Sequence, residues 1–289
     1  MRIRNYEKCR ISRTSGCLSN CFKNILKNTY HNTRLDLGGI VIDPYTFRLG
    51  NVKCSTHTIF QLLDEVRSLL NNKELVPRTI LDVNAHIYNI AYSDAVLRQT
   101  INAARIVAAD GMSIVWASRL FGAKIPERCN MTEAFRAFLQ NESIPKNVGI
   151  LVGTTEEEAK AAAINIDKVS THCRIKKVVS GYMQDSDYKQ IFASLEDIDF
   201  IFIGMGTPKS QKIIRMASTL CPQAIVWHIG AGTIKIIAGS MKEAPVFLRR
   251  TGLQWLHRLY CDPIVLWRRY LIGNPLFLYR IFKSRMQPW

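Results

Sequence analysis

Short apolar runs alternate with amphipathic stretches along most of the chain from residue 40 onward. Strands are predicted by the runs GGIVID, RTILDV, RIVAAD, VGILVG, RIKKVV, DFIFIG and AIVWH. Helical periodicity connects several of these runs, over residues 56–70, 94–104, 113–120 and 154–166. Continuous apolar strands that alternate with amphipathic helices are typical of a parallel sheet covered on both faces. The sequence therefore predicts an α/β fold, doubly wound around a mostly parallel, Rossmann-like sheet.

The composition divides this chain of 289 residues into three segments. Residues 1–38 are basic, polar and weakly periodic, which predicts a mobile extension. Residues 39–240 carry the strand and helix pattern and form the predicted α/β core. Residues 241–289 interleave paired arginines with Trp, Leu and Phe, which predicts a helical basic appendage. At 47% hydrophobic residues, the chain can bury a sizeable core.

The positive charge is concentrated at the two ends of the chain. Residues 1–53 hold 10 Lys and Arg against 3 Asp and Glu, and residues 235–289 hold 10 against 2. The middle has 19 basic and 18 acidic residues. Basic ends indicate a polyanionic partner, and the aromatic C-terminal segment fits an anionic membrane surface. The competing interpretation is that Trp255 and Trp267 belong to the core of terminal helices.

Membrane crossing and secretion are not expected from the sequence. No apolar run reaches the roughly 18–20 residues of a spanning helix, and Arg268 and Arg269 interrupt the best C-terminal candidate. The eight cysteines form no C-x-x-C pair, and no signal-peptide pattern follows the first arginines. We therefore expect a reducing, cytoplasmic protein with free thiols, whose C-terminal segment could lie on a membrane surface without crossing it.

No metal site and no cofactor are predicted. Cys9, Cys17 and Cys21 have the wrong spacing for a zinc knuckle. Asp185-Ser186-Asp187 resembles a D-x-D metal motif, but a solvated turn is the favoured interpretation.

Glycine turns stand where a parallel sheet of this kind binds its ligand. Each of these glycines follows a predicted strand and precedes a predicted helix: Gly153, Gly204, Gly206, Gly230 and Gly232. Both G-x-G pairs lack the third glycine of the dinucleotide fingerprint, so a Rossmann-type dinucleotide-dependent oxidoreductase is the weaker hypothesis. Lys209, close to Gly206, favours a bound phosphate or diphosphate.

Asp110 and Asn84 end two predicted strands. Asp110 stands immediately before Gly111 and a new helix, a position that suits a general base in a cleft. The alternative is that Asp110 is the N-cap of that helix. Asp110 and Asn84 together suggest a polar pocket that can hydrogen-bond a sugar hydroxyl.

The order of several short motifs resembles a known family. The motifs are Asn84-Ala85-His86, ADGMSIVW over 109–116, Pro126-Glu127-Arg128, GMGTPK over 204–209, Ala238-Gly239, Ala244-Pro245, Trp255, Arg258-Leu259, Pro263 and Arg268-Arg269-Tyr270. In this order they resemble the WecG/TagA/CpsF family of bacterial glycosyltransferases, over roughly residues 40–282. The resemblance implies metal-independent, inverting transfer of a sugar from a UDP-sugar donor onto a polyprenyl-diphosphate-linked saccharide acceptor in surface polysaccharide synthesis. It also implies a cytoplasmic enzyme that lies peripherally on the inner face of the bacterial cell membrane.

The resemblance also implies roles for individual residues. Asp110 matches the catalytic base, Asn84 would hold the sugar, and Arg128 matches an arginine at the edge of the cleft. The turn with Gly206, Pro208 and Lys209 would lie near the nucleotide. C-terminal arginines would neutralise the UDP leaving group, and the candidates are Arg249, Arg250, Arg258, Arg268 and Arg269. Arg258 is the first choice among them.

The chain departs from the family pattern at several positions, and other questions stay open. Asp82 stands where the family usually has Thr, so it could contact the sugar or supply a second carboxylate. Nucleic-acid binding through the basic ends is a further alternative, but it lacks a recognition motif and leaves Asp110 unexplained; no nucleic-acid partner is therefore predicted. The sequence determines neither the transferred sugar nor whether the chain forms a homo-oligomer.

Overall fold

The computed structural model describes residues 35–36, 41–42, 45–72 and 76–286. The chain divides into two units, Met1–Pro44 and Tyr45–Trp289. In the first unit, β1 (Leu35–Asp36) and β2 (Val41–Ile42) form an antiparallel pair. The expected extension over residues 1–38 lies, apart from β1, outside the described residues, as does the run GGIVID apart from β2.

An eight-stranded sheet forms the centre of the second unit, in the order β3-β4-β6-β5-β10-β9-β7-β8. Its strands are β3 (Thr46–Leu49), β4 (Val52–Ser55), β5 (Thr79–Val83), β6 (Ile106–Ala109), β7 (Asn147–Gly153), β8 (Cys173–Val179), β9 (Phe200–Gly204) and β10 (Ile225–His228). All neighbouring strands run parallel except β3 and β4. The doubly wound, mostly parallel sheet predicted from the apolar runs is therefore confirmed.

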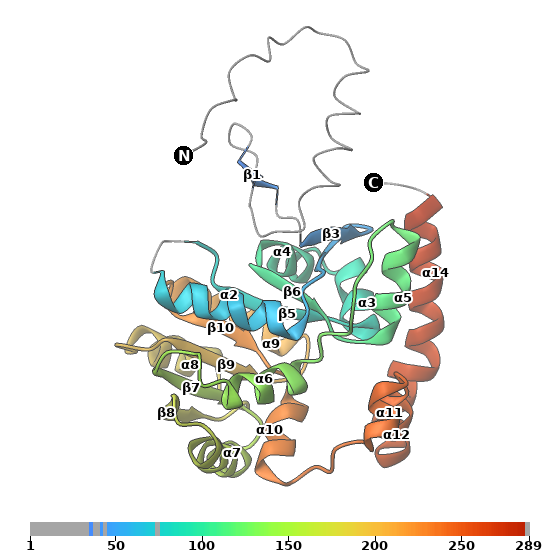
Figure 1. Cartoon of the computed structure of the whole chain (residues 1–289). Coiled ribbons are helices and arrows are strands. Elements are labelled where there is room, and N and C mark those ends of the chain that lie inside the picture. The colour runs from blue at the N-terminus through green and yellow to red at the C-terminus, as the bar shows by residue number, and fades with distance from the viewer. Residues whose placement is uncertain (1–34, 37–40, 43–44, 73–75, 287–289) are drawn as a thin grey trace, which may run out of the picture. The chain divides into compact units, whose positions relative to one another are not determined.

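Helices cover both faces of this sheet (Figure 1). One face packs against α3 (Ala85–Ser93), α4 (Ala95–Ala103), α5 (Met112–Leu120), α8 (Asp185–Ala193), α9 (Lys209–Leu220) and α14 (Gly273–Met286). The other packs against α2 (Ile59–Asn71), α6 (Met131–Gln140), α7 (Glu156–Val169) and α10 (Ala231–Ala238). Thr155 is the N-cap of α7, because its side chain accepts a hydrogen bond from the Glu158 N–H.

Two elements were not distinguished by the apolar pattern. The hairpin of β3 and β4 turns at Gly50, which has a φ of +59°, and β3 is a partly exposed edge strand with little hydrophobic signal. Helix α3 follows β5 after the single residue Asn84. In the sequence, the apolar residues of the helix therefore continue those of the strand without a visible boundary.

The C-terminal segment is helical, as predicted, and it also completes the core. Its elements are α11 (Val246–Arg250), α12 (Gln254–Cys261), α13 (Pro263–Trp267), the π-helical turn η1 (Arg268–Ile272) and α14. Phe277 and Ile281 of α14 are fully buried, and Phe277 meets Tyr88 of α3 edge-on at 5.2 Å between ring centroids. Among the described residues, no helix is both long and apolar enough to span a membrane.

Candidate active site

A cavity of about 470 Å³ opens between the carboxyl ends of β5 and β6 and the C-terminal helices. The residues that follow the two strands, Asn84 and Asp110, line one side. The C-terminal segment lines the other with Trp255, Arg258 and Arg269 among others. Because parallel strands present their carboxyl ends at one edge of a sheet, this is where such folds bind ligands.

Asp110 is held rigidly at the end of β6. Its backbone N–H donates to the Val83 carbonyl at 2.9 Å, and Gly111, with a φ of +144°, turns the chain into α5. Gly111 is the N-cap of α5 and no side chain caps it, so Asp110 does not have the capping role considered from the sequence. The Asp110 carboxylate instead faces the cavity.

The surroundings raise the pKa of Asp110 to about 6. Burial is the main cause and the nearby Asp82 carboxylate adds to it, whereas Arg258, Arg128 and a hydrogen bond from Asn130 act in the opposite direction. A carboxylate with this pKa is ionised at neutral pH and is a stronger base than an exposed one. Asp110 therefore has the protonation behaviour of a general base.

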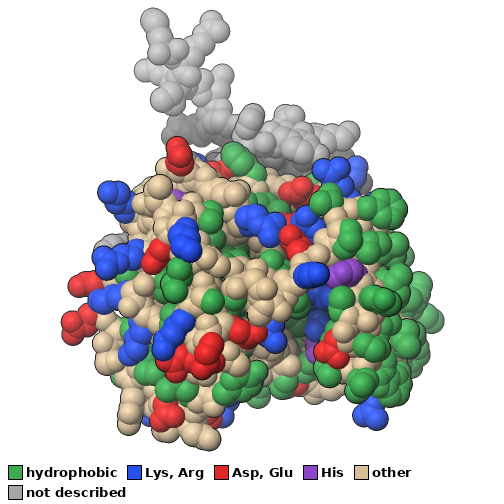
Figure 2. All heavy atoms as spheres, turned by 90° about the horizontal axis from the view of Figure 1, so that it is seen from below, with side chains coloured by type: hydrophobic (Ala, Val, Ile, Leu, Met, Phe, Trp, Pro, Cys, Tyr) green, Lys and Arg blue, Asp and Glu red, His purple; other side chains and the backbone are tan. Residues whose placement is uncertain are grey.

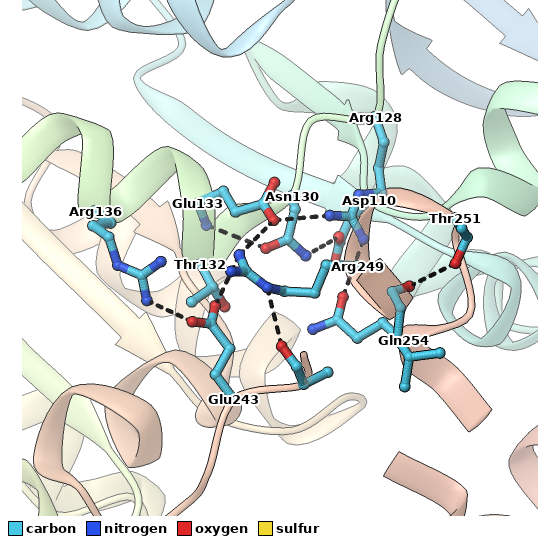
Figure 3. A network of polar contacts seen from close by, with 12 residues as sticks. Asp110, Arg128, Asn130, Thr132, Glu133, Arg136, Glu243, Arg249, Thr251 and Gln254 are labelled. Atoms are coloured by element: carbon cyan, nitrogen blue, oxygen red, sulfur yellow. Dashed lines mark hydrogen bonds and ion pairs between the residues drawn. The ribbon is translucent and has the colours of Figure 1, made fainter. Parts of the chain in front are cut away.

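Asn130, which the sequence analysis did not identify, orients Asp110. Its Nδ2 donates to Asp110 Oδ1 at 2.7 Å, and its Oδ1 accepts from the Glu133 N–H at 3.2 Å as the N-cap of α6 (Figure 3). The cap fixes which half of the amide points to Asp110. Asn130 three residues before Glu133, ahead of an apolar stretch, is a recognisable cap pattern, but it carries no sign of the contact with Asp110.

Asn84 also caps a helix while it lines the cavity. Its Oδ1 accepts from the N–H groups of His86 and Ile87, both at 3.1 Å, at the start of α3. The amide NH₂ is then the half that can donate to a bound hydroxyl. His86 lines the cavity as well, and burial, helped by the charge of Arg269, lowers its pKa to about 4. His86 is therefore neutral at physiological pH.

Three arginines lie on the cavity wall: Arg128, Arg258 and Arg269. Arg128 donates to Glu133 Oε1 and to Gln254 Oε1, both at 3.0 Å, and so connects α6 to α12 (Figure 3). No ion pair within the described part of the chain involves Arg258 or Arg269, and the Arg269 Nε is buried without a hydrogen-bond partner there. Two cations are thus available to an anionic ligand.

The other C-terminal arginines lie away from the cavity. Arg249 donates from Nη1 to Glu133 Oε1 at 3.1 Å and from Nε to the Ala244 carbonyl at 3.1 Å, which fastens α11 to the core (Figure 3). Arg250 and Arg268 are exposed, and Arg268 lies over the ring of Trp267. Arg258, the first choice from the sequence, is one of the two that face the cavity.

The glycines of the predicted turns are not among the residues that line this cavity. A Cβ on Gly153 would lie 2.1 Å from the Gly204 carbonyl oxygen, and one on Gly204 would lie 2.0 Å from Ile234 Cδ1. These two glycines let β7, β9 and α10 pack closely. Gly206 and Gly230 have open surroundings, and Gly232 faces the Arg258 guanidinium.

Lys209 and Asp82 also have protein partners. Exposed Pro208 is the N-cap of α9, and the adjacent Lys209 donates from Nζ to the Met183 carbonyl at 3.3 Å, toward α8. Asp82 is buried and lies beside His228 instead of lining the cavity. The turn with Lys209 and the cavity with Asp110 are two separate places at the same edge of the sheet.

No group of three or more His, Cys, Asp or Glu side chains within the described ranges is arranged to hold a metal ion. Asp185 and Asp187, expected in a solvated turn, belong to the first turn of α8, where Asp187 completes a capping box and Asp185 pairs with Lys212.

An extensive apolar surface covers the C-terminal helices beside the cavity, as Figure 2 shows on its right side. Its most exposed side chains include Phe247, Tyr260, Ile264, Val265, Leu271, Tyr279 and Met286. Trp116 and Leu278 are more than half exposed and also line the cavity, so the apolar surface continues to the cavity mouth.

Comparison with known proteins yields one family and several relatives. Residues 47–289 match the model of the glycosyl transferase WecG/TagA/CpsF family. An N-acetylglucosaminyldiphosphoundecaprenol N-acetyl-beta-D-mannosaminyltransferase of Staphylococcus aureus strain NCTC 8325 is 26% identical over 233 residues, which are 79% of this chain and 89% of that protein. The protein of the same description from strain MRSA252 is 25% identical over 232 residues, with the same coverage.

Proposed function

Since the chain belongs to the glycosyl transferase WecG/TagA/CpsF family, we propose that it transfers a sugar from a UDP-sugar onto a polyprenyl-diphosphate-linked saccharide during bacterial surface polysaccharide synthesis. The Staphylococcus aureus relatives are named for an N-acetylmannosaminyl group and an N-acetylglucosaminyldiphosphoundecaprenol. The observation that carries the proposal is a single cavity that holds a strand-end carboxylate with a raised pKa and two arginines without carboxylate partners among the described residues.

In the proposed step, Asp110 is the general base. The acceptor hydroxyl oxygen attacks the anomeric carbon of the donor sugar while the bond from that carbon to the diphosphate oxygen breaks. The hydroxyl proton passes to Asp110, and UDP leaves with the bonding electrons. Attack from the face opposite the leaving group inverts the anomeric configuration. Asp110 suits this role because it is rigidly placed, faces the cavity and is ionised above about pH 6.

The arginines supply the charge that the leaving diphosphate requires. Arg258 and Arg269 line the cavity, and guanidinium groups bind phosphate oxygens through paired, charge-assisted hydrogen bonds. Arg128 is already bonded to Glu133 and Gln254, so its proposed part is to hold α12, and Arg258 with it, against the core. With these cations in place, the proposed reaction needs no metal ion.

Neutral polar groups complete the site on the sugar side. The Asn84 amide is fixed by the α3 cap and can donate to a sugar hydroxyl. His86, neutral because its pKa is lowered to about 4, can donate or accept without adding charge beside the arginines. We propose that these two residues contact the sugar. Buried Asp82 does not line the cavity and acts only through the pKa of Asp110.

We also propose that the apolar surface of the C-terminal helices lies on the cytoplasmic face of the cell membrane. A lipid-linked acceptor has a headgroup in the aqueous phase and a chain in the bilayer, so the enzyme must work at that boundary. The cavity mouth, with Trp116 and Leu278, continues into this apolar surface. Nearby exposed arginines such as Arg250 and Arg268 fit anionic headgroups.

The test is a transfer assay with the full chain, a short-chain lipid-diphosphate N-acetylglucosamine and a panel of UDP-sugars, with and without EDTA. We expect consumption of one UDP-sugar, unchanged turnover in EDTA, and a product whose anomeric configuration, measured by NMR, is opposite to that of the donor. A protein that binds no UDP and transfers no sugar from the panel would contradict the proposal. Strict dependence on a divalent cation would remove the arginine-based account of the leaving group.

A further inference from the structure

A buried acid–histidine pair lies directly behind the proposed base. Asp82 near the end of β5 and His228 at the end of β10 are only 5% and 4% exposed. The Asp82 Oδ1 and the His228 Nδ1 are 2.5 Å apart. Neither side chain lines the cavity, so the proposed transfer step uses neither of them directly.

The surroundings of His228 favour its charged form. Its Nε2 lies 3.1 Å from the Met205 carbonyl oxygen, so both ring nitrogens face an acceptor and the imidazolium can donate to both. Burial alone would lower the pKa of His228. The Asp82 carboxylate, the hydrogen bond to it, the Met205 carbonyl and the charge of Asp110 together raise that pKa above its usual value. With an acceptor beside each ring nitrogen, the contacts of this pair suit an imidazolium next to a carboxylate.

Asp82 and Asp110 are electrostatic neighbours. Strands β5 and β6 pair with Asp82 opposite Ala108, and the Asp110 N–H donates to the Val83 carbonyl. The titratable and charged groups that face Asp110 are Asp82 on β5, His228 on β10, Arg128 and Cys129 before α6, and Arg258 on α12. A second carboxylate this close opposes ionisation of Asp110 unless a cation compensates it.

We propose that His228 is a positioning residue for sugar transfer: its imidazolium neutralises and holds Asp82, so that Asp110 stands in the cavity as a carboxylate. This inference rests on the proposed role of Asp110 as the base. The contact with Met205 also connects the pair to the turn between Gly204 and Gly206. A purely structural ion pair would stabilise the fold and leave the protonation of Asp110 unchanged.

The decisive experiment compares the pH dependence of kcat/KM in the full-length wild type, His228→Gln, Asp82→Asn and the double variant. The acidic limb of this profile is the fall of kcat/KM at low pH, which reports protonation of Asp110. Removing His228 leaves Asp82 without its cation and raises the pKa of Asp110, so this limb should move up by about one pH unit in His228→Gln. Asp82→Asn should not move it up, because the carboxylate that raises the pKa of Asp110 is lost together with the imidazolium charge that compensates it. Adding Asp82→Asn to His228→Gln should return the limb to its wild-type position.

Two measurements keep the proposal testable without turnover. A ¹³C NMR titration of the Asp110 carboxyl, assigned with Asp110→Asn, should show the same upward shift in His228→Gln, so it separates this proposal from the proposed reaction. If His228→Gln does not fold, ¹⁵N NMR of the wild type decides, because His228 should be doubly protonated at pH 7. A neutral ring there, or an acidic limb that is unchanged in His228→Gln, would overturn the proposal.

Discussion

Asn130 Nδ2 donates a 2.7 Å hydrogen bond to Asp110 Oδ1, and the same Asn130 caps α6 through its Oδ1. One amide thus connects the start of a helix to the proposed base. Because the cap uses the oxygen, only the NH₂ group can face the carboxylate, and this bond favours the ionised form of Asp110. One side chain therefore contributes both to the position of α6 and to the protonation of Asp110.

Two substitutions at Asn130 should separate these two roles. Asn130→Ser can still accept the Glu133 N–H, whereas Asn130→Ala loses the cap and should cost about 1 kcal/mol more in free energy of unfolding. Both remove the amide donor, so both should raise the acidic limb of the kcat/KM profile by about half a pH unit. Urea unfolding and pH-dependent kinetics measure the two effects. Limbs that differ between the two variants would show that helix position, not the hydrogen bond, sets the protonation of Asp110.

Asp110 itself should determine the acidic limb. Because its pKa is about 6, wild-type kcat/KM should fall tenfold per pH unit below about pH 6 and reach a plateau above it. Asp110→Asn should lose about 10²- to 10⁴-fold in kcat while UDP binding, measured by calorimetry, stays within about threefold. Wild-type-like turnover in this variant would remove Asp110 from the mechanism.

The free energy of unfolding of Asp110→Asn is a control for this experiment, because the pKa of Asp110 predicts the direction in which it should change. The pKa of Asp110 is raised from 3.8 in its reference state to about 6 in the folded protein. The folded state thus binds the proton more tightly, and stability from this group is lost as pH rises between these values. Asp110→Asn should therefore be no less stable than the wild type at pH 7, so its lost activity cannot be attributed to unfolding.

The two groups of C-terminal arginines should differ in UDP affinity. Arg258 lines the cavity without a carboxylate partner among the described residues, whereas Arg250 is exposed on α11. Arg258→Ala should weaken UDP binding about 10- to 100-fold, as expected for loss of a charge-assisted hydrogen bond. It should also raise the acidic limb, because Arg258 lowers the pKa of Asp110. Arg250→Ala is the matched control, and calorimetry should find its UDP affinity within about twofold of wild type.

The sequence predicts local patterns well and long-range partners poorly. Asp110 and Asn84 could be predicted to lie side by side in a pocket, because the hydrophobic pattern shows where a strand ends and a helix begins. The contacts of Asn130 with Asp110 and of His228 with Asp82 join residues 20 and 146 positions apart. The pairing of β5 with β10 brings Asp82 and His228 together, whereas the position of α6 brings Asn130 to Asp110. Arg258 and Arg250 have the same chemistry in the sequence, and the packing of α11 and α12 decides which one faces the cavity.

The glycine turns illustrate the same limit. A glycine between a strand and a helix indicates close approach of the backbone, but not what approaches it. At Gly153 and Gly204 the approaching groups are the neighbouring strand and Ile234 of α10. Lys209, near Gly206, is directed toward Met183 and the ring of Tyr188. Neither arrangement could be read from residue spacing.

Gly153 should accordingly be essential for folding. An alanine Cβ there would lie 2.1 Å from the Gly204 carbonyl oxygen, and the φ of +148° is unfavourable for any side chain. Gly153→Ala should lose about 3 kcal/mol or more in free energy of unfolding, or fail to fold. Gly206→Ala is the control, because an alanine Cβ at that position would meet no atom within 4 Å, and it should stay within about 1 kcal/mol of wild type. A stable Gly153→Ala protein would mean that β7 and β9 can separate.

The apolar surface of the C-terminal helices should be required for membrane binding. Deletion of the whole segment cannot test this, because Phe277 and Ile281 belong to the core. The double variant Ile264→Glu, Leu271→Glu changes only exposed side chains and should lose most of its co-sedimentation with anionic vesicles, since it removes apolar contact and adds repulsion. The matched control is Ile164→Glu, Val169→Glu on α7, which is exposed to a similar degree and distant in sequence.

Transfer activity distinguishes functional membrane binding from nonspecific adsorption to vesicles. With the lipid-linked acceptor embedded in vesicles, the Ile264→Glu, Leu271→Glu variant should lose about tenfold or more in rate. With a short-chain acceptor in solution it should match the wild type, because neither residue lines the cavity with Asp110. Equal losses with both acceptors would indicate that the substitutions disturb α12 and Arg258. Equal vesicle binding by this variant and the α7 control would place the membrane contact on another surface.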